Sequence, residues 1–231
     1  MQGLKVVITG GFGVLGRATA LAAAAKGARV ALVDFAPRAP DELKAALGEG
    51  AAFIAGADLS DPARAQAAMD EAAAALGGID ALLNIAGGFV WQTLQDGDPA
   101  GWERMFRLNL ATCANASRAA LPHLIASKSG RIVNVGANAA VRAAAGMGAY
   151  AASKAGVHKL TESLAEELKG RVTVNAVLPS IIDTPQNRAD MPDADPTAWV
   201  SPSDLAAVML FLASPGSSAV TGALVPVTGT L

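Results

Sequence analysis

The chain has 231 residues, of which 52% are hydrophobic and 16% charged, and its formal net charge is -2. This size and composition suit one soluble α/β domain with a substantial apolar core, so we expect a single domain over residues 1–231. The basic residues form no stripe, which argues against nucleic acid or an anionic membrane as a partner and favours a small-molecule substrate.

Residues that mark metal binding, disulfides or secretion are scarce. Cys113 is the only cysteine, and His123 and His158 are the only histidines, so we expect neither an intrachain disulfide nor a metal site. The opening segment MQGLKVVITG runs into a strand pattern without the features of a signal peptide. No apolar run approaches the roughly 20 residues that a membrane span needs. We therefore expect a cytoplasmic protein.

Short β-branched runs alternate with longer alanine-rich amphipathic runs along the chain. In chain order, we expect strands at residues 4–9, 28–34, 51–56, 79–87, 130–136, 172–179 and 223–227, with helices between them at 13–26, 41–47, 61–76, 101–126, 147–169 and 202–213. Apolar strands that alternate with helices predict a parallel sheet covered on both faces. Right-handed crossovers then give a doubly wound, Rossmann-type sheet of about seven strands.

Residues 180–199 form the one long polar and proline-rich interruption of this alternation. A connection of that length in a compact domain usually carries function, so we expect a lid or substrate loop. Asn187 and Arg188 in this segment are candidates to bind a polar or anionic substrate group, because Arg suits bidentate recognition. A solvated loop charge is the alternative.

The sequence VVITGGFGVLG, residues 6–16, ends the first expected strand and opens the first helix. Backbone N–H groups and the helix dipole at such a junction can hold a pyrophosphate. Gly11, Gly13 and Gly16 satisfy G-x-G-x-x-G, whereas Gly10, Gly13 and Gly16 satisfy G-x-x-G-x-x-G, so the register stays open. In both registers the expected cofactor-binding residues of the loop are Gly10, Phe12, Gly13, Val14, Leu15 and Gly16.

Asp34 closes the second expected strand. A carboxylate at this position can accept hydrogen bonds from the adenosine ribose hydroxyls, and its charge would repel a 2'-phosphate. We therefore expect NAD as the cofactor. Arg38 nearby keeps NADP open as the less favoured choice, and a plain glycine turn with a solvent-facing Asp is the structural alternative.

Tyr150 and Lys154 stand four residues apart in an expected helix and so share one face. A positive charge beside a phenol favours the phenolate, and we expect Lys154 to lower the Tyr150 pKa. A tyrosine tuned in this way can pass a proton to or from a substrate oxygen. The same spacing also occurs by chance in ordinary amphipathic helices.

Four motifs give this pair a context. TGGFGVLG, NIAGG, YAASKAG and VNAVLPSIIDTP, in this order and at these intervals, resemble the short-chain dehydrogenase/reductase family over essentially the whole chain. The resemblance implies a nicotinamide cofactor and an Asn-Ser-Tyr-Lys catalytic set. By position it implies Tyr150 as the acid/base, Lys154 as the residue that binds the nicotinamide ribose and tunes the tyrosine, and Asn109 as the holder of a water in the proton relay.

The resemblance also implies cofactor contacts and a quaternary structure. The implied contacts are Asp58 and Leu59 for adenine, Asn84, Ala86 and Gly87 for the supporting turn, and Pro179, Ile182 and Thr184 for the nicotinamide and its carboxamide. In the family, the long helix and the tyrosine helix pair between subunits. We therefore expect a homodimer or homotetramer.

Two departures from the family pattern narrow the comparison. Ala137 stands where the family has its serine, and Val14 stands where most members have a glycine. Both departures resemble the quinoid dihydropteridine reductases, whose motifs the chain also echoes in GMGAYAASKAGVHKL and DTPQNRADMPDADPTAW. That branch reduces a quinonoid pterin with NADH, and such a ring takes hydride with little polarisation. Phe89, however, stands where those reductases carry a tryptophan.

Aromatic and flexible apolar residues near the expected loops are candidates for a substrate wall, with core packing as the alternative: Phe89, Trp91, Met147 and Trp199. The leading hypothesis is an oxidoreductase that moves hydride between NADH and a small carbonyl or quinonoid/imine substrate. One alternative is a cofactor-binding regulatory protein with reduced catalysis. The other is a general ketone or 3-oxoacyl reductase in which Asn138 donates the hydrogen bond that the serine would give.

Overall fold

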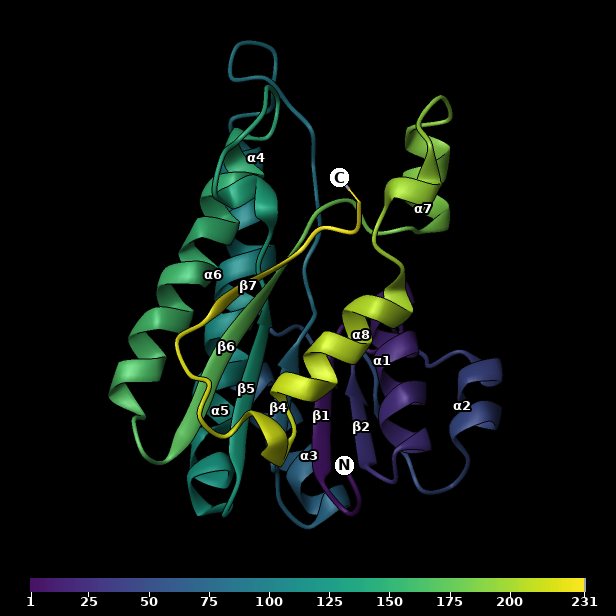
Figure 1. Ribbon diagram of the computed structural model, residues 1–231, viewed down its shortest axis with the longest axis vertical. Coiled ribbons are helices and arrows are strands. Elements are labelled where there is room, and N and C mark those ends of the chain that lie inside the picture. Colours follow the sequence, from purple (N-terminus) through teal and green to yellow (C-terminus); the bar gives the residue numbers. More distant parts are fainter. Residues whose placement is uncertain (231) are drawn as a thin grey trace.

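Parallel strands form one central sheet in the protein, whose computed structural model describes residues 1–230 (Figure 1). The sheet in these residues has seven strands in the order β3-β2-β1-β4-β5-β6-β7. The strands are β1 (Lys5–Thr9), β2 (Arg29–Val33), β3 (Ala52–Ile54), β4 (Ala81–Asn84), β5 (Gly130–Val135), β6 (Val172–Pro179) and β7 (Leu224–Val227). Because all neighbours pair in parallel, their carboxyl ends meet at one edge. The predicted doubly wound sheet is confirmed.

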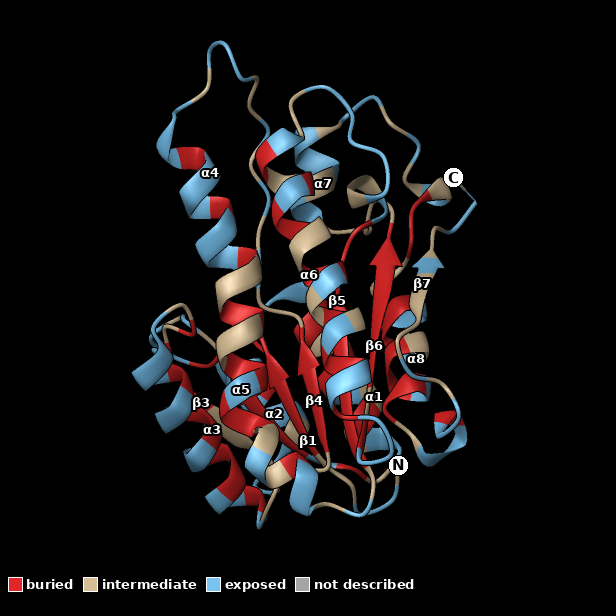
Figure 2. Cartoon of the chain, turned by 90° about the vertical axis from the view of Figure 1, so that its left-hand side faces the viewer, coloured by how far each residue is buried: buried red, intermediate tan, exposed pale blue. Residues whose placement is uncertain are grey.

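Helices cover both faces of this sheet (Figures 1 and 2). They are α1 (Val14–Ala25), α2 (Asp41–Leu47), α3 (Pro62–Leu76), α4 (Ala100–Met105), α5 (Thr112–Ala126), α6 (Gly148–Glu167), α7 (Pro185–Asp190) and α8 (Pro202–Leu212). Short turns of other helix types are the π-helical η1 (Phe106–Ala111) and the 3-10 helices η2 (Asn138–Ala140), η3 (Pro196–Ala198) and η4 (Pro215–Ser217). Within residues 1–230, no helix is long and apolar enough to cross a membrane.

The core consists of two apolar layers, because successive strand residues point to opposite faces of the sheet. Val7, Leu82 and Ile132 pack with α3, α5 and α6 on one face. Ile8 and Leu83, one residue further along β1 and β4, pack with α1 and α8 on the other. Figure 2 shows the inner strands almost wholly buried between these layers, whereas the edge strand β7 is partly exposed. The near-continuous apolar strands of the sequence follow from this burial on both sides.

Capping side chains fix where several helices begin. Asp61 accepts hydrogen bonds from the first N–H groups of α3, and Ser201 accepts one at the start of α8. Each is followed by a proline, which suits the first helical position because it lacks an N–H. Helix α1 differs, since Gly13 precedes it without any side-chain cap. Its first N–H groups therefore point toward the carboxyl edge of the sheet without a capping partner.

Two segments depart from the sequence prediction. The long helix expected over 101–126 contains the π-helical turn η1, where the wider turn shifts the side chains that follow. The expected loop 180–199 contains α7 and η3, because Thr184 and Asp195 cap short turns that proline residues start. The segment is thus a structured arm above the carboxyl edge and not an irregular loop (Figure 1).

Candidate active site

The glycine loop between β1 and α1 is closely packed against the turn after β4. Gly10 has a φ of +64°, and a Cβ there would lie 2.9 Å from the backbone of Ala86. A Cβ on Gly16 would collide with the carbonyl oxygen of Gly10. At Gly13, by contrast, a Cβ would meet only that oxygen, at 3.5 Å. Gly10 and Gly16 are therefore required by the fold, whereas Gly13 lies on the open side of the loop.

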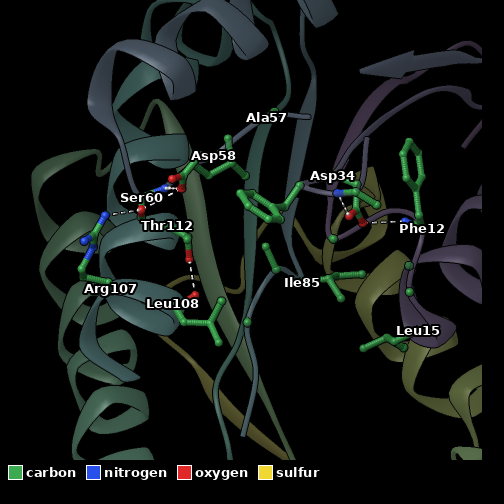
Figure 3. A pocket seen from close by; sticks show the side chains of 18 of the residues that line it. Phe12, Leu15, Asp34, Ala57, Asp58, Ser60, Ile85, Arg107, Leu108 and Thr112 are labelled. Atoms are coloured by element: carbon green, nitrogen blue, oxygen red, sulfur yellow. Dashed lines mark hydrogen bonds between the residues drawn. The ribbon is translucent and has the colours of Figure 1, made fainter. Parts of the chain in front are cut away.

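A cavity of about 1270 Å³ opens beside this loop (Figure 3). Its walls come from the glycine loop, the carboxyl ends of β2, β3 and β4, the helical stretch from α4 to α5, and the start of α7. Of the predicted cofactor-binding residues, it is lined by Gly10, Phe12, Gly13, Val14, Leu15, Gly16, Asp34, Asp58, Leu59, Ala86, Gly87 and Thr184. The lining does not include the other predicted cofactor-binding residues, which are Asn84, Tyr150, Lys154, Pro179 and Ile182.

Asp34 is held firmly at one end of the cavity (Figure 3). Its Oδ2 accepts a hydrogen bond of 2.9 Å from the Phe12 N–H, and its Oδ1 accepts one of 2.9 Å from the Ala36 N–H. Each carboxylate oxygen has more than one acceptor site, so both can still accept bonds from a ligand. The carboxylate is thus oriented by the protein before any ligand binds.

Asp58 forms a second polar group across the cavity (Figure 3). Its Oδ1 accepts hydrogen bonds from the Ser60 N–H at 2.9 Å and the Ser60 hydroxyl at 2.7 Å. These bonds, foremost that of the hydroxyl, lower the pKa of Asp58 below its usual value. Nη2 of Arg107, on η1, donates to the Ser60 hydroxyl at 3.2 Å and so joins this corner to the long helix.

The turn after β4 connects the cavity to the catalytic candidates. Asn84 does not line the cavity but supports the turn from below, where its Nδ2 donates to Asn134 Oδ1 at 2.8 Å and to Ser117 Oγ at 2.9 Å. At Gly87, a Cβ would lie 2.6 Å from Asn109 Oδ1 and 3.3 Å from Lys154 Nζ. Gly87 is therefore the point at which the cofactor cavity meets the catalytic group.

Asn109 is buried on η1, and both its amide oxygen and its amide nitrogen are hydrogen-bonded. Its Oδ1 accepts from the Gly88 N–H at 2.9 Å, while its Nδ2 donates to the Gly88 carbonyl at 3.1 Å and to Ser153 Oγ at 3.0 Å. The Ser153 hydroxyl in turn donates to the carbonyl of Tyr150 at 2.7 Å. Asn109 thus ties the glycine turn to the start of α6, and π-helical turns such as η1 often occur at functional sites.

Lys154 and Tyr150 lie on successive turns of α6, as predicted, but their electrostatics differ from the prediction. Lys154 is 5% exposed, and its Nζ donates to the carbonyl of Val135 at 2.7 Å. Burial lowers the pKa of Lys154 to about 8. Burial raises the pKa of Tyr150 to about 12. The prediction that Lys154 lowers the Tyr150 pKa is wrong in this arrangement, because the ammonium group points at the end of β5 and desolvation dominates.

The surroundings of Tyr150 are apolar on the side where the family has a hydroxyl. Ala137 is 2% exposed, so its methyl group packs inside the protein. Asn138, the next residue, is exposed at the start of η2. The ring of Phe89 stands nearly perpendicular to that of Tyr150, with centroids 4.9 Å apart and an interplanar angle of 86°. An aromatic edge contact of this kind is a stabilising geometry.

The other candidates for a substrate wall take varied positions. Trp91 Nε1 donates to the Ala145 carbonyl at 3.1 Å, which ties two loops together and leaves the ring 59% exposed. Met147 directly precedes α6 and is partly buried. Asn187 Nδ2 donates to the Ile182 carbonyl at 2.7 Å, so its amide is already engaged. Trp199 is only 7% exposed and packs in the interior.

Several cavity residues had no place in the sequence prediction: Phe35, Ala36, Ala57, Ser60, Ile85, Ala100, Glu103, Arg104, Arg107, Leu108, Thr112, Pro185 and Gln186. Phe35 and Ser60 stand within two residues of the predicted Asp34 and Asp58, so the strand ends could have indicated them. Arg104 and Arg107 carry no such signal, because α4 and η1 follow a long connection from β4 whose path the sequence pattern does not determine.

The comparisons with known proteins agree with this geometry. Residues 4–195 match the family profile of the short chain dehydrogenases. The chain belongs to the short-chain dehydrogenase family. It is 36% identical over 233 residues to the meso-2,3-butanediol dehydrogenase of Serratia marcescens, an alignment that covers 97% of this chain and 92% of the relative.

Two solved structures from Brucella melitensis share the whole fold. One is a short-chain dehydrogenase/reductase described as a glucose/ribitol dehydrogenase, with a TM-score of 0.92, 33% identity, and 99% and 96% of the two chains covered. The other is a 3-ketoacyl-(acyl-carrier-protein) reductase complexed with NADH, with a TM-score of 0.88, 28% identity, and 100% and 99% covered. The protein is therefore an NAD(P)-dependent oxidoreductase.

The cavity fits a nicotinamide dinucleotide. The uncapped N-terminus of α1 offers N–H groups for a pyrophosphate, and the open side of Gly13 lets it approach the backbone. Asp34 and Asp58 offer oriented carboxylates at the strand ends that line the cavity. Gly87 brings the cavity next to Lys154 and Asn109, where the family's reacting group would lie.

The buried ammonium group of Lys154 predicts a pH-dependent stability. Its pKa of about 8 in the folded protein lies below the ordinary 10.5, so folding carries a desolvation cost wherever the group is protonated. That cost disappears as the pH rises from about 8 to 10.5. Over this window, we expect the free energy of unfolding to rise in the wild type relative to Lys154→Met, measured by denaturant titration. The exposed Lys159→Met is the matched control on α6, and a constant difference between wild type and Lys154→Met would contradict the expectation.

Proposed function

We propose that the protein is an NADH-dependent reductase of a small carbonyl or quinonoid/imine substrate, with Tyr150 as the proton donor. The observation that carries this proposal is the continuity of the carboxyl edge, where the cavity with Asp34 joins Lys154 and Asn109 at Gly87. A bound nicotinamide would supply the hydride. Side chains of the protein donate the proton, bind the nicotinamide ribose and return a proton to the donor.

Tyr150 is suited to give a proton. With its pKa raised to about 12, the phenol is protonated at neutral pH. As the carbon of the substrate's C=O or C=N bond takes up hydride, the heteroatom takes the phenolic proton, so the double bond is reduced and the cofactor oxidised. Lys154 and Asn109 keep the roles that the family resemblance implies. Lys154 binds the nicotinamide ribose, and Asn109 holds a water in the path that returns a proton to Tyr150.

The cavity favours NADH over NADPH. Two backbone N–H groups hold the carboxylate of Asp34 at the end of β2, where it would repel a 2'-phosphate. Arg17 does not offset this charge, because its Nη1 pairs with Glu42 at 2.9 Å and its Nε donates to the Phe12 carbonyl at 2.7 Å. Arg17 therefore does not neutralise Asp34, and the exposed Arg38, four residues after Asp34, is the remaining nearby cation.

The residues around the Tyr150 hydroxyl favour a planar ring as substrate, one whose reacting double bond needs little polarisation. The methyl of Ala137 offers no donor, and the exposed Phe89 ring stands against Tyr150. A quinonoid or imine ring can stack on such an aromatic face and accept hydride without a hydroxyl beside its oxygen. A substrate like that of the quinoid dihydropteridine reductases fits these conditions.

A second candidate rests on Asn138, which is exposed at the start of η2. Its amide can donate a hydrogen bond to a ketone oxygen. In that case, the protein is a general ketone or 3-oxoacyl reductase, a class that includes the ketoacyl reductase of similar fold.

We also propose a homodimer or homotetramer. Trp102 on α4 and Phe106 on η1 are 43% and 53% exposed, which leaves apolar surface on the long helix. This is the helix that pairs between subunits in the resembled family. Large exposed apolar side chains that lie together on one helical stretch favour contact with a protein partner over contact with solvent.

The choice of cofactor predicts the effect of Asp34→Ala. Removing the carboxylate should weaken NADH and relieve the repulsion of NADPH, so the ratio of kcat/KM for NADH to that for NADPH should fall at least about tenfold. Steady-state kinetics with both cofactors measure this ratio. Asp41→Ala, an exposed change at the start of α2, is the control, and an unchanged ratio in Asp34→Ala would refute the proposed preference.

Tyr150→Phe tests the proton donor. The variant keeps the ring against Phe89 but loses the hydroxyl, so turnover should fall by roughly 10²–10⁴-fold, the usual contribution of general acid catalysis. Binding of NADH, followed by fluorescence titration, should stay within about twofold, because the phenol lies outside the dinucleotide cavity. The assays use quinonoid dihydropterin as the quinonoid substrate and diacetyl as a small ketone. Turnover of either near the wild-type level would exclude Tyr150 as the proton donor.

Ala137→Ser and Asn138→Ala separate the two substrate classes. If the substrate is a quinonoid ring, Ala137→Ser and Asn138→Ala should both leave turnover of quinonoid dihydropterin within about threefold. If the protein is a general ketone reductase, Asn138→Ala should lower diacetyl reduction about tenfold or more, because a donor to the developing oxyanion is lost. Steady-state assays of both variants with both substrates distinguish these outcomes.

A further inference from the structure

His158 is a buried polar residue to which the proposed chemistry gives no role. It stands on α6 one turn beyond Lys154 and is 5% exposed. Its Nε2 accepts a hydrogen bond from the Ala137 N–H at 3.3 Å. A Cβ at Gly136 would lie 2.5 Å from that nitrogen, so a glycine at 136 is what lets the ring approach the backbone.

Lys154 and His158 together hold the segment that leaves β5. Lys154 Nζ donates to the Val135 carbonyl at 2.7 Å, and His158 Nε2 accepts from the Ala137 N–H two residues later. Without His158, this buried N–H would have to find another acceptor or bear the cost of an unsatisfied donor. Asn138 and the turn η2 follow directly, so their position relative to α6 depends on these two bonds.

The bond from Ala137 requires His158 to be neutral, because a protonated Nε2 would face another donor. The charged groups that act on the ring are Lys154, Lys159 and Glu162, all on α6. From the segment after β5 it meets Gly136 and Ala137, and Leu178 of β6 lies beside Gly136; none of these three residues ionises. Burial, followed by the charge of Lys154, lowers the pKa of His158 and so keeps the ring neutral at neutral pH.

We propose that His158 is a positioning residue for the reaction. It fixes the turn at Ala137 and Asn138 against the catalytic helix through the main chain, on the side of Tyr150 where the family's serine hydroxyl is missing. The inference rests on the proposed function, because it takes Tyr150 as the reacting group. It goes further because it names a hydrogen bond, from the Ala137 N–H to His158, that sets the position of Ala137 and Asn138 relative to Tyr150.

Two variants of His158 test the proposal by activity. Leu removes the acceptor at similar volume, whereas Gln keeps an acceptor oxygen that does not titrate. With quinonoid dihydropterin and NADH, His158→Leu should lower kcat about tenfold while the KM for NADH stays within about twofold, and His158→Gln should recover kcat to within about threefold. The wild type should lose kcat at acid pH as the ring gains a proton, and His158→Gln should lack this acid limb.

The Ala137 amide gives a second readout that does not depend on turnover. By NMR, its hydrogen exchange should be protected in the wild type at neutral pH, unprotected in His158→Leu, and protected at every pH in His158→Gln. Equal protection in all three proteins, or a wild-type kcat and pH profile in His158→Leu, would overturn the proposal.

The two readouts also separate this inference from the proposed function. If neither the wild type nor a variant turns over quinonoid dihydropterin or diacetyl, but the Ala137 amide is protected as described, the proposed reaction is wrong. His158 then still holds the turn at Ala137 and Asn138. If His158→Leu does not fold, the comparison of the wild type with His158→Gln tests the proposal. An acid loss of kcat and of Ala137 amide protection in the wild type alone supports it, and the same pH dependence in both proteins contradicts it.

Discussion

The hydrogen bond from the Lys154 ammonium group to the Val135 carbonyl is the interaction on which the site depends. It places a charged group inside the protein at the end of a buried strand, where only a strong acceptor compensates for lost hydration. The bond joins the face of α6 that carries Lys154 to the end of β5. The positions of Tyr150, Ser153 and His158 follow, since each lies on the helix face or edge that Lys154 turns toward the sheet.

Much of the fold could be predicted from the sequence because its signals are local. Apolar strands buried on both faces read as continuous β-branched runs, and the caps at Asp61 and Ser201 mark helix starts. The glycine loop and Asp34 could be placed at one edge because parallel strands bring their carboxyl ends together. The structure shows that both candidates for the first glycine of the motif are restricted: Gly10 takes a left-handed turn, and a Cβ at Gly11 would lie 2.7 Å from the Leu32 side chain.

The remaining features depend on tertiary packing, which has no local pattern. The π-helical turn at Asn109 arises within an otherwise ordinary helical sequence. The raised pKa of Tyr150 comes from burial, which outweighs the sequence argument based on a nearby lysine. Arg107 donates to Ser60 from η1, which lies 47 residues further along the chain. Trp199, a candidate for the substrate wall, is a buried residue directly after η3.

The glycines of the first loop carry different kinds of constraint. At positions 10 and 16 the protein's own backbone leaves no room for a side chain, so substitutions there act through the fold itself. At position 13 the backbone is extended, with a φ of -77° that any residue can adopt, and a Cβ would meet only the Gly10 carbonyl oxygen, so the protein alone would tolerate a methyl group. A requirement for glycine at position 13 must therefore come from the bound dinucleotide and not from the packing of the protein itself.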